Sequence, residues 1–312
     1  MKKIKLYLIP LITIFIIACE KEVKVNQDDY APKAVLNCLL NPYLDTVIAE
    51  LSESRDMLYD KGIFPPIKNA TIILYDNGVN VGTFTEIFDG KYILPYTVIK
   101  GHSYKIEVSN TKFDDLSATT IVPNPAIINS FNVEMLLLPD NVKANIDINF
   151  KDAPNEGNYY GIAMERIDTN RLEAPPSYPG YEYHPPYPQT YFCSSDLNIE
   201  FPTEELESGV CSDLILMSDK GFNGQNYNFN CYSEYYLYNN GIEVTDTTYY
   251  TKIKLYFKTY NEDYYKYVLS TKIAQWNYGN PFAEPVRIYN NITGGFGIFG
   301  ALNTVVDSVS FN

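Results

Sequence analysis

Residues 251–260 read TKIKLYFKTY, a stretch in which two sets of side chains alternate. One set is Thr251, Ile253, Leu255 and Phe257, and the other is Lys252, Lys254 and Tyr256. An alternation of period two places the two sets on opposite faces of a β-strand. The stretch therefore predicts a two-faced strand with one face in a hydrophobic core.

The composition of the 312-residue chain agrees with a mainly β fold. Tyrosine is abundant, with 29 residues, and Ile, Val and Thr enrich the other predicted strands, which suits pleated, half-buried surfaces. The length is enough for two domains. The formal net charge of −14 becomes −17 once Lys2, Lys3 and Lys5 are removed with a signal peptide. Such an acidic protein is not expected to bind nucleic acid or an anionic membrane surface electrostatically.

The N-terminus predicts export and lipidation. Three lysines precede an apolar run from Leu6 to Ala18, which is the pattern of a secretory signal and too short to span a membrane. The ending Ile16-Ile17-Ala18-Cys19 resembles a bacterial lipobox. We therefore expect residues 1–18 to be a signal peptide and Cys19 to carry several acyl chains, which together make a stable anchor. The alternative is an ordinary signal peptide that contains a cysteine.

The remaining four cysteines are an even number in a compartment where disulfides persist. Cys193, Cys211 and Cys231 lie in one segment, so a bridge among these three is favoured over a pairing with Cys38. Their spacing contains no CxxC pair, which argues against a zinc site. Buried free thiols are the alternative.

Residues 19–32 are polar and predict a flexible tether. Residues 33–123 predict an immunoglobulin-like β-sandwich, because short apolar or alternating runs are separated by turn signals. The predicted strands are Lys33–Leu40, Asp45–Leu51, Ala70–Asp76, Val81–Ile87, Lys91–Leu94, Ser103–Val108 and Ala118–Val122.

Pro123 and Pro125 mark a boundary, and residues 126–312 predict a second β-rich domain with one C-terminal helix. Its predicted strands are Ile127–Met135, Val142–Phe150, Tyr159–Ile167, Asp213–Met217, Ser233–Tyr238, Thr247–Tyr260, Pro285–Ile292 and Gly297–Val309. The helix has a capping Asn261, two acids in its first turn and Gly279 at its end. Its apolar stripe of Tyr265, Leu269, Ile273 and Trp276 places the only tryptophan in the core.

Several motifs that resemble functional sites lack the context that their chemistry needs. Gly295-x-Gly297-x-x-Gly300 matches the dinucleotide fingerprint, but β-branched residues follow it instead of a helix, so we expect no cofactor there. These glycines are expected to let a strand bend or to pack closely against the helix. The segment Asp219–Gly224 lacks the repeated acids of an EF-hand, so a polar turn is favoured over a calcium loop.

Histidine chemistry is not indicated either. His102 and His184 fall in different predicted domains, and no HExxH, GxSxG or P-loop pattern occurs. His102 follows a turn signal and is expected to be solvated. No catalytic residue and no metal ligand is therefore predicted.

The segment 173–192, EAPPSYPGYEYHPPYPQTYF, is an extended insertion in the second domain. Its six prolines exclude a central strand and favour a polyproline II conformation. The five tyrosines are candidate binding residues, because stiff chain that carries amphipathic rings loses little entropy on binding. They are Tyr178, Tyr181, Tyr183, Tyr187 and Tyr191. The alternative is a rigid flap whose rings fill grooves of its own domain.

Two resemblances extend these expectations. Residues 69–76, 89–92 and 101–104 resemble carboxypeptidase-regulatory or transthyretin-like modules, which are structural. Residues 280–286 and 289–301, reading NPFAEPV and YNNITGGFGIFGA, resemble the closing motif of a Bacteroidota outer-membrane lipoprotein family known only as a domain of unknown function. The resemblance covers nearly all of the chain after Cys19. Members of that family are often encoded beside TonB-dependent receptors, and no catalytic residues are defined for it.

We therefore expect a surface-facing, lipid-anchored outer-membrane protein that is not an enzyme. It is expected to assist a TonB-dependent transporter by capturing or gating ligand, without a cofactor. The alternative is a structural or adhesion lipoprotein that binds glycan or a cell-surface protein. An enzyme ranks third, because β-sandwich hydrolases exist and fold does not decide function.

Overall fold

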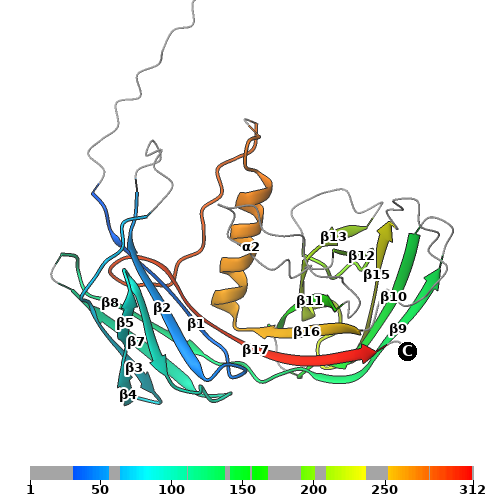
Figure 1. Ribbon diagram of the computed structural model, residues 1–312, viewed down its shortest axis with the longest axis horizontal. Helices are drawn as coiled ribbons and strands as arrows, with labels where there is room; N and C mark the ends of the chain where they lie inside the picture. Colours follow the sequence, from blue (N-terminus) through cyan, green and yellow to red (C-terminus); the bar gives the residue numbers. More distant parts are fainter. Residues whose placement is uncertain are drawn as a thin grey trace, which may run out of the picture. The chain divides into compact units, whose positions relative to one another are not determined.

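Strand β17 (Phe296–Ser310) lies inside an eight-stranded sheet and links the two halves of the chain. The computed structural model describes residues 31–55, 64–110, 112–137, 141–154, 157–167, 191–200, 209–236, 252–280 and 282–310 (Figure 1). Lys33–Asn312 forms one compact unit, and Met1–Pro32 is assigned to a separate one. Within the described residues, no helix is both long enough and apolar enough to cross a membrane.

The described residues form mainly strands, as predicted, with one α-helix near the C-terminus. The strands of the first half are β1 (Ala34–Leu40), β2 (Thr46–Glu53), β3 (Thr71–Asp76), β4 (Val79–Thr83), β5 (Thr85–Phe88), β6 (Lys91–Pro95), β7 (Ser103–Ser109) and β8 (Leu116–Ile121). The second half contains β9 (Ile127–Leu137), β10 (Asn141–Lys151), β11 (Tyr159–Ile167), β12 (Phe192–Ser194), β13 (Val210–Ser212), β14 (Leu214–Ser218), η2 (Asp219–Gly221), β15 (Asn226–Tyr236), β16 (Lys252–Tyr260), α2 (Glu262–Trp276) and β17.

Strand β17 changes its partner halfway along its length. Its first part, Phe296–Ala301, pairs in parallel with β1, and the remainder pairs antiparallel with β16. The order of the sheet is β14-β11-β16-β17-β1-β2-β6-β5. One strand therefore connects the N-terminal part of the sheet to the part built from the second half of the chain.

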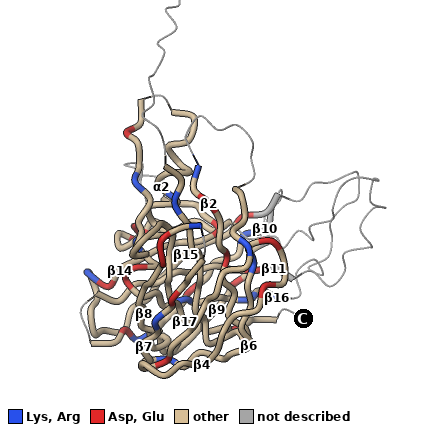
Figure 2. Tube along the Cα trace, turned by 90° about the vertical axis from the view of Figure 1, so that its left-hand side faces the viewer, with Lys and Arg blue, Asp and Glu red and all other residues tan. Residues whose placement is uncertain are grey.

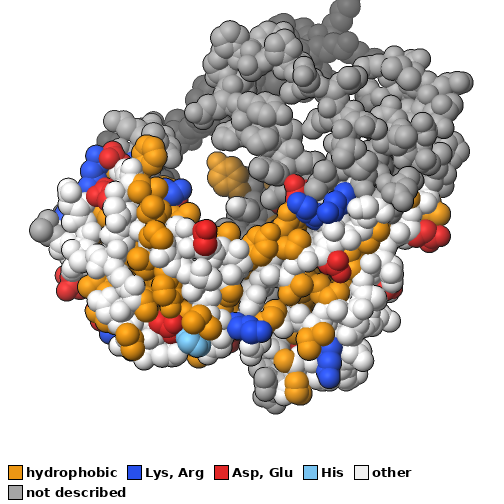
Figure 3. Space-filling view, turned by 60° about the horizontal axis from the view of Figure 1, so that its bottom comes forward, with side chains coloured by type: hydrophobic (Ala, Val, Ile, Leu, Met, Phe, Trp, Pro, Cys, Tyr) orange, Lys and Arg blue, Asp and Glu red, His pale blue; other side chains and the backbone are white. Residues whose placement is uncertain are grey.

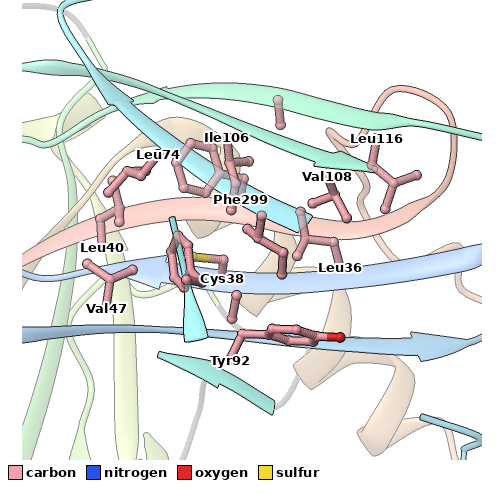
Figure 4. Packing of buried hydrophobic residues seen from close by; sticks show 14 of the residues in the cluster. Leu36, Cys38, Leu40, Val47, Leu74, Tyr92, Ile106, Val108, Leu116 and Phe299 are labelled. Carbon is pink, nitrogen blue, oxygen red and sulfur yellow. The ribbon is translucent and has the colours of Figure 1, made fainter. Parts of the chain in front are cut away.

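The predicted N-terminal β-sandwich is confirmed. The four-stranded sheet β4-β3-β7-β8 shares one hydrophobic cluster with β1, β2 and β6. Alternate residues of β1 and β7 are buried in this cluster, as strand periodicity requires. Figure 4 shows Leu36, Cys38 and Phe299 from one sheet beside Leu74 and Ile106 from the other. Removal of these side chains from water is the main stabilising contribution.

The second half of the chain forms another two-layered core. The five-stranded sheet β13-β12-β15-β10-β9 packs against β14, β11 and β16. The ring of Phe150 lies at its centre, with centroid distances of 5.2 Å to Tyr160 and 4.7 Å to Phe257. The first pair is edge-to-face and the second is tilted, and such aromatic pairs add to the stabilisation from burial. Figure 3 shows that both halves also expose hydrophobic side chains, interspersed with polar ones.

The predicted boundary at residues 123–126 falls between the two hydrophobic clusters. The first cluster, however, also contains Ile292, Phe299 and Ala301 from the end of the chain. The division into 33–123 and 126–312 stays a prediction, and the structure adds that the first segment lacks a strand without β17. Sequence periodicity cannot reveal this pairing, because it joins residues from nearly opposite ends of the chain.

Helix α2 begins as predicted but buries less than predicted. The Asn261 side chain caps it by accepting a hydrogen bond from a backbone N–H of the first turn. Tyr265 is buried, whereas the side chain of Trp276 is 57% exposed, so the prediction that Trp276 lies in the core is wrong. The helix contacts the sheet through its first turns, and its C-terminal end points away from the strands (Figure 1).

No strand forms at residues 285–292, contrary to the prediction. The Asn291 side chain instead replaces a strand partner there: its Oδ1 accepts from Phe299 N at 2.9 Å and its Nδ2 donates to Phe299 O at 2.9 Å. Tyr289 N donates to Ser270 Oγ on α2 at 2.9 Å. The segment is therefore held between β17 and the helix. Strands β12 and β13 were not predicted, because three residues are too few to show a period.

The glycine motif near the C-terminus serves close packing, as predicted. A Cβ atom on Gly300 would lie 2.6 Å from side-chain carbons of Tyr264 on α2. Gly297 has φ +112°, and a Cβ atom there would lie 2.0 Å from Leu36 O. No side chain fits at either position, so glycine is required where β17 meets β1 and the helix.

Two buried acids hold the turn at residues 219–224, which begins with η2. Asp152 Oδ2 accepts from Gly224 N at 2.6 Å, and Asp152 also accepts a hydrogen bond from the Tyr160 hydroxyl. Asp219 Oδ2 accepts from Asn158 N at 3.0 Å. Burial raises the pKa of Asp152, and this effect exceeds the opposing effect of its hydrogen bonds.

The close approach at Gly297 yields a first prediction. Gly297→Ala should reduce the free energy of unfolding by about 3 kcal/mol or more, because both the left-handed φ and the contact with Leu36 O oppose a side chain. Gly101→Ala is the matched control, since Gly101 has φ +78° but open space around it, and it should cost about 1–2 kcal/mol. Urea denaturation measures both. Equal losses would show that the β1–β17 approach tolerates a methyl group.

The buried Asp152 yields a second prediction. Its pKa is raised in the folded state, so the stability that it contributes is complete below its ordinary pKa of about 3.8 and is lost as the pH rises through the folded-state pKa. The free energy of unfolding of the wild type, relative to Asp152→Asn, should therefore fall between pH 4 and pH 7. Urea denaturation of both proteins across this range tests it. Asp307→Asn, at an exposed site on β17, is the control, and a pH-independent difference for Asp152→Asn would contradict the prediction.

Candidate functional site

A hollow of about 630 Å³ opens on one face of the five-stranded sheet. Strands β9, β10 and β15 form its floor, and β12 with the residue before β13 forms one side. We call it the polar hollow. Its lining residues are Asn132, Val133, Glu134, Asn145, Ile146, Asp147, Cys193, Ser194, Ser195, Gly209, Asn230, Cys231 and Tyr232.

Strand alternation explains why polar side chains gather there. In β10, Ala144, Ile146 and Ile148 are buried in the core, whereas the residues between them are only partly buried. Asn145 and Asp147 therefore point to the opposite face, toward the hollow. The same alternation in β15 buries Phe229 and Cys231 and exposes their neighbours.

The register of the three strands aligns these side chains in two rows. Asp147 lies opposite Asn132 on one side and Asn230 on the other. Asn145 lies opposite Glu134 and Tyr232 in the same way. Side chains in directly paired positions lie about 5 Å apart at Cβ, so each row presents a continuous line of donors and acceptors.

Rows on either side of the hollow are occupied by contacts within the protein. On one side, Asn129 Nδ2 donates to Asn149 Oδ1 at 2.6 Å, and Asn149 donates in turn to Asn228. On the other side, Lys143 pairs with Glu234 at 3.4 Å, and its Nζ lies 4.0 Å from the centroid of the Tyr232 ring. These contacts lie beside the hollow.

Within the described part of the chain, five side chains of the two rows make no hydrogen bond or ion pair with one another or with other side chains. They are Asn132, Glu134, Asn145, Asp147 and Asn230. Polar side chains at the borders of the hollow are thus bound to other side chains, whereas these five side chains inside it are available to a ligand. A ligand in the hollow could use these groups without breaking contacts of the protein.

The side of the hollow is held by a disulfide and a buried hydroxyl. Cys193 and Cys211 are bonded to each other and join β12 to β13. Ser194 Oγ donates to Asn230 O at 2.6 Å and so ties β12 to β15. Of the three cysteines considered for a bridge, Cys231 remains a thiol that is buried on the core side of β15, and Cys38 is also a buried thiol.

The buried thiols are unsuited to nucleophilic chemistry. Burial raises the pKa of Cys231, and the nearby Asp147 carboxylate raises it further. Burial likewise raises the pKa of Cys38. A protonated, enclosed thiol is a poor nucleophile.

Of the five tyrosines of the 173–192 insertion, only Tyr191 falls within the described residues. Tyr178, Tyr181, Tyr183 and Tyr187 lie outside them, and so does Cys19. Tyr191 stands two residues before Cys193, the residue is 67% exposed, and its backbone oxygen accepts from Ser233 Oγ at 2.6 Å. The end of the insertion is therefore attached to β15, the strand that also supplies Asn230 and Tyr232.

The sequence predicted that His102 is solvated, but in the structure the His102 side chain also contacts an acid. Its Nδ1 lies 2.8 Å from Asp76 Oδ1, and Asp76 Oδ2 accepts from the Tyr96 hydroxyl at 2.7 Å and the Tyr104 hydroxyl at 3.1 Å. Tyr104 also accepts from Ile99 N at 2.8 Å. These contacts pin residues 96–102 to the ends of β3 and β7, and we assign them a structural role.

A second hollow, of about 410 Å³, lies beside Pro123–Ala126 and is lined by Asp152 and Tyr160. Its polar groups already serve the protein, since Asp152 binds Tyr160 and Gly224, and Thr259 Oγ1 accepts from Ala126 N. Fewer groups remain for a ligand there than in the polar hollow. The polar hollow is therefore the stronger candidate site.

Sequence analysis did not find the polar hollow. The Asn-, Asp- and Glu-rich outward positions of β9, β10 and β15 were visible as alternation, but the register that aligns them was not. Figure 2 shows acidic and basic positions interspersed along the described chain, so charge does not mark the site either.

Comparisons with solved structures give remote similarities. A mutant alpha-2-macroglobulin of Salmonella is 14% identical over 74% of this chain and 14% of that one, with a TM-score of 0.23. The Escherichia coli alpha-2-macroglobulin activated by porcine elastase is 12% identical over 74% and 18%, with a TM-score of 0.21. The chain thus spans less than a fifth of the length of either protein, and likeness at this level carries no functional inference.

No curated protein matches the chain. One family model does, and it is described as a domain of unknown function, DUF4249. The match covers residues 20–307, which include every described strand from β1 to β16 and most of β17. The chain therefore belongs to the DUF4249 family.

Proposed function

We propose that this protein is a lipid-anchored binding protein of a bacterial outer membrane that captures a hydroxyl-rich ligand, such as an oligosaccharide, in the polar hollow. We further propose that it serves a TonB-dependent transporter as a non-enzymatic accessory. The observation that carries the ligand proposal is the set of five free polar side chains around one hollow.

The chemistry of the lining favours a neutral, hydroxyl-rich ligand. Asn132, Asn145 and Asn230 each offer both a donor and an acceptor, and two carboxylates add strong acceptors for hydroxyl groups. Among the described residues of the lining there is no lysine, arginine or histidine, so an anionic ligand would meet two carboxylates without a compensating cation from these residues. Tyr232 supplies an aromatic ring at the border.

The anchoring proposal is supported by the N-terminal sequence. The DUF4249 match begins at residue 20, directly after the cysteine that ends the lipobox-like Ile16–Cys19 segment. The resemblance of residues 280–301 to Bacteroidota outer-membrane lipoproteins supports the compartment and the association with a transporter. The Cys231 thiol next to the hollow is a poor nucleophile, because burial raises its pKa.

A second candidate function is adhesion, in which the same hollow binds a glycan of a neighbouring surface. The hollow is open to solvent on the sheet face, which suits a ligand attached to a larger body. The two functions share the ligand class and differ in whether the ligand is passed to a transporter.

The anchor gives a third prediction. Cys19→Ser should move the protein from the detergent phase to the aqueous phase on Triton X-114 partitioning, because the acyl chains that hold it to the membrane are lost. The double variant Cys193→Ala/Cys211→Ala should remain in the detergent phase, since that disulfide holds β12 to β13 and has no part in anchoring. Unchanged partitioning of Cys19→Ser would contradict lipidation.

The polar hollow gives a fourth prediction. The purified protein should be retarded in native gels that contain a neutral polysaccharide, tested with a panel of starch, inulin and xylan. Asp147→Ala should weaken this binding by about tenfold to a hundredfold, because hydrogen bonds to a charged group contribute about 1.5–3 kcal/mol. Asn145→Ala should weaken it by about fivefold.

The matched control is Asn149→Ala, which lies two residues from Asp147 on the same strand but outside the lining. Its affinity should equal that of the wild type, and thermal unfolding should confirm that all variants are folded. Equal effects of Asn145→Ala and Asn149→Ala would contradict a site in the hollow. Absence of retardation by every polysaccharide in the panel would contradict the ligand class.

A further inference from the structure

Three aromatic side chains are strongly exposed where α2 ends. Trp276 is 57% exposed, Tyr278 92% and Phe282 94%. We call these three residues the aromatic tip. Soluble proteins rarely present several large rings together to water unless the rings contact a partner or a membrane.

The chain around the aromatic tip carries no charge. Residues 273–283 contain no Asp, Glu, Lys or Arg, although one residue in five of the whole chain is charged. The chain that follows α2 is mostly tan in Figure 2. An uncharged segment can enter a membrane interface without desolvating ionised groups, which is the main cost for most surface segments. Trp and Tyr are the residues that prefer this interface.

Hydrogen bonds fix the helix that carries the aromatic tip to the rest of the protein. At the base of α2, Asn261 N donates to Ala301 O at 3.0 Å, and Asn261 Oδ1 accepts from Ala301 N at 2.9 Å. The returning segment is bound to the helix through Tyr289, whose hydroxyl donates to Asp263 Oδ1 at 2.5 Å. The 15-residue helix places its end about 22 Å from this base. The tip is therefore held clear of the sheet.

The start of β1, which follows the predicted tether in the sequence, lies on the same side of the Lys33–Asn312 unit as the C-terminal end of α2. The segment that follows the aromatic tip leads to Phe296, which pairs with Val35 at the start of β1. Figure 1 shows the start of β1 and the C-terminal end of α2 at the upper side of the Lys33–Asn312 unit. The tether from Cys19 to Pro32 has 14 residues and spans at most about 50 Å. A lipid on Cys19 would therefore keep this side of the molecule near the bilayer.

We propose that the aromatic tip inserts into the interface of the membrane that holds the Cys19 lipid. The tip then acts as a second, weak contact that fixes the orientation of the protein on the membrane. This inference rests on the proposed lipid anchor and is independent of the ligand. The lipid surface is neutral or zwitterionic where the tip enters, since the strongly acidic protein is repelled by anionic headgroups.

The single tryptophan makes the inference measurable, because all tryptophan fluorescence comes from Trp276. The lipidated full-length protein is reconstituted into phosphatidylcholine vesicles, and Cys19→Ser protein in buffer is the water-exposed reference. In vesicles, Trp276 emission should shift to shorter wavelength, and its acrylamide quenching constant should fall at least threefold. Brominated phosphatidylcholine should quench it.

Two variants make the test specific. Tyr278→Ser/Phe282→Ser should still float with the vesicles but return the acrylamide quenching of Trp276 toward the reference value. Tyr43→Ser/Phe88→Ser removes two exposed rings elsewhere and should leave the shielding of Trp276 unchanged.

The outcomes separate the tip from the anchor. Protein that fails to float with vesicles would overturn the lipid anchor and the tip contact together. Protein that floats while Trp276 stays as accessible to acrylamide as in buffer would overturn the tip contact alone. Shielding of Trp276 that appears only after a partner protein is added would also overturn the membrane contact.

Discussion

The parallel pairing of β1 with the first part of β17 is the contact on which the rest of the structure depends. It connects the N-terminal sandwich to the strands of the second half in one sheet. Gly297 allows the approach, because a Cβ atom there would collide with the backbone of Leu36. Ala301, at the end of this pairing, forms hydrogen bonds with the backbone N–H and the side-chain oxygen of Asn261, and these bonds position the start of α2. The sheet and the helix are thus positioned by the same few residues.

The sequence predicted secondary structure correctly where the residues of one segment determine it by themselves. The alternation of Ile253, Leu255 and Phe257 predicted β16, and Asn261 followed by two acids predicted the start of α2. The exposure of Trp276 could not be predicted from the sequence. The apolar stripe of the helix shows which side chains share a face, but it does not show how far along the helix the sheet contacts that face. Within residues 285–292, the Asn291 side chain forms the two hydrogen bonds with Phe299 that a neighbouring strand would otherwise form. Strand propensities cannot predict this arrangement.

The candidate site shows the same division. Alternation in β10 puts Asn145 and Asp147 on the face opposite Ile146, which the sequence shows directly. The site itself arises because β9 and β15 bring Glu134 and Asn230 to the same rows, and register depends on the whole sheet. Sequence reasoning chose the tyrosines of the 173–192 insertion because proline and aromatic residues are conspicuous in composition. Of these, Tyr191 directly precedes β12, and its backbone oxygen accepts a hydrogen bond from Ser233 on β15, the strand that also supplies Asn230 and Tyr232 to the hollow.

The position of β17 has a consequence for how the protein is made. The strand that completes the N-terminal sandwich is synthesised after all the other described strands, and most of the given sequence separates it from its parallel partner. Contacts of such long sequence separation form late, because loop closure must precede them. Until β17 arrives, β1 has an open edge with unpaired backbone groups, which favours association with other chains. A polypeptide that stops before β17 thus keeps an unpaired edge on β1, so the N-terminal sandwich is protected from association only after β17 has been made.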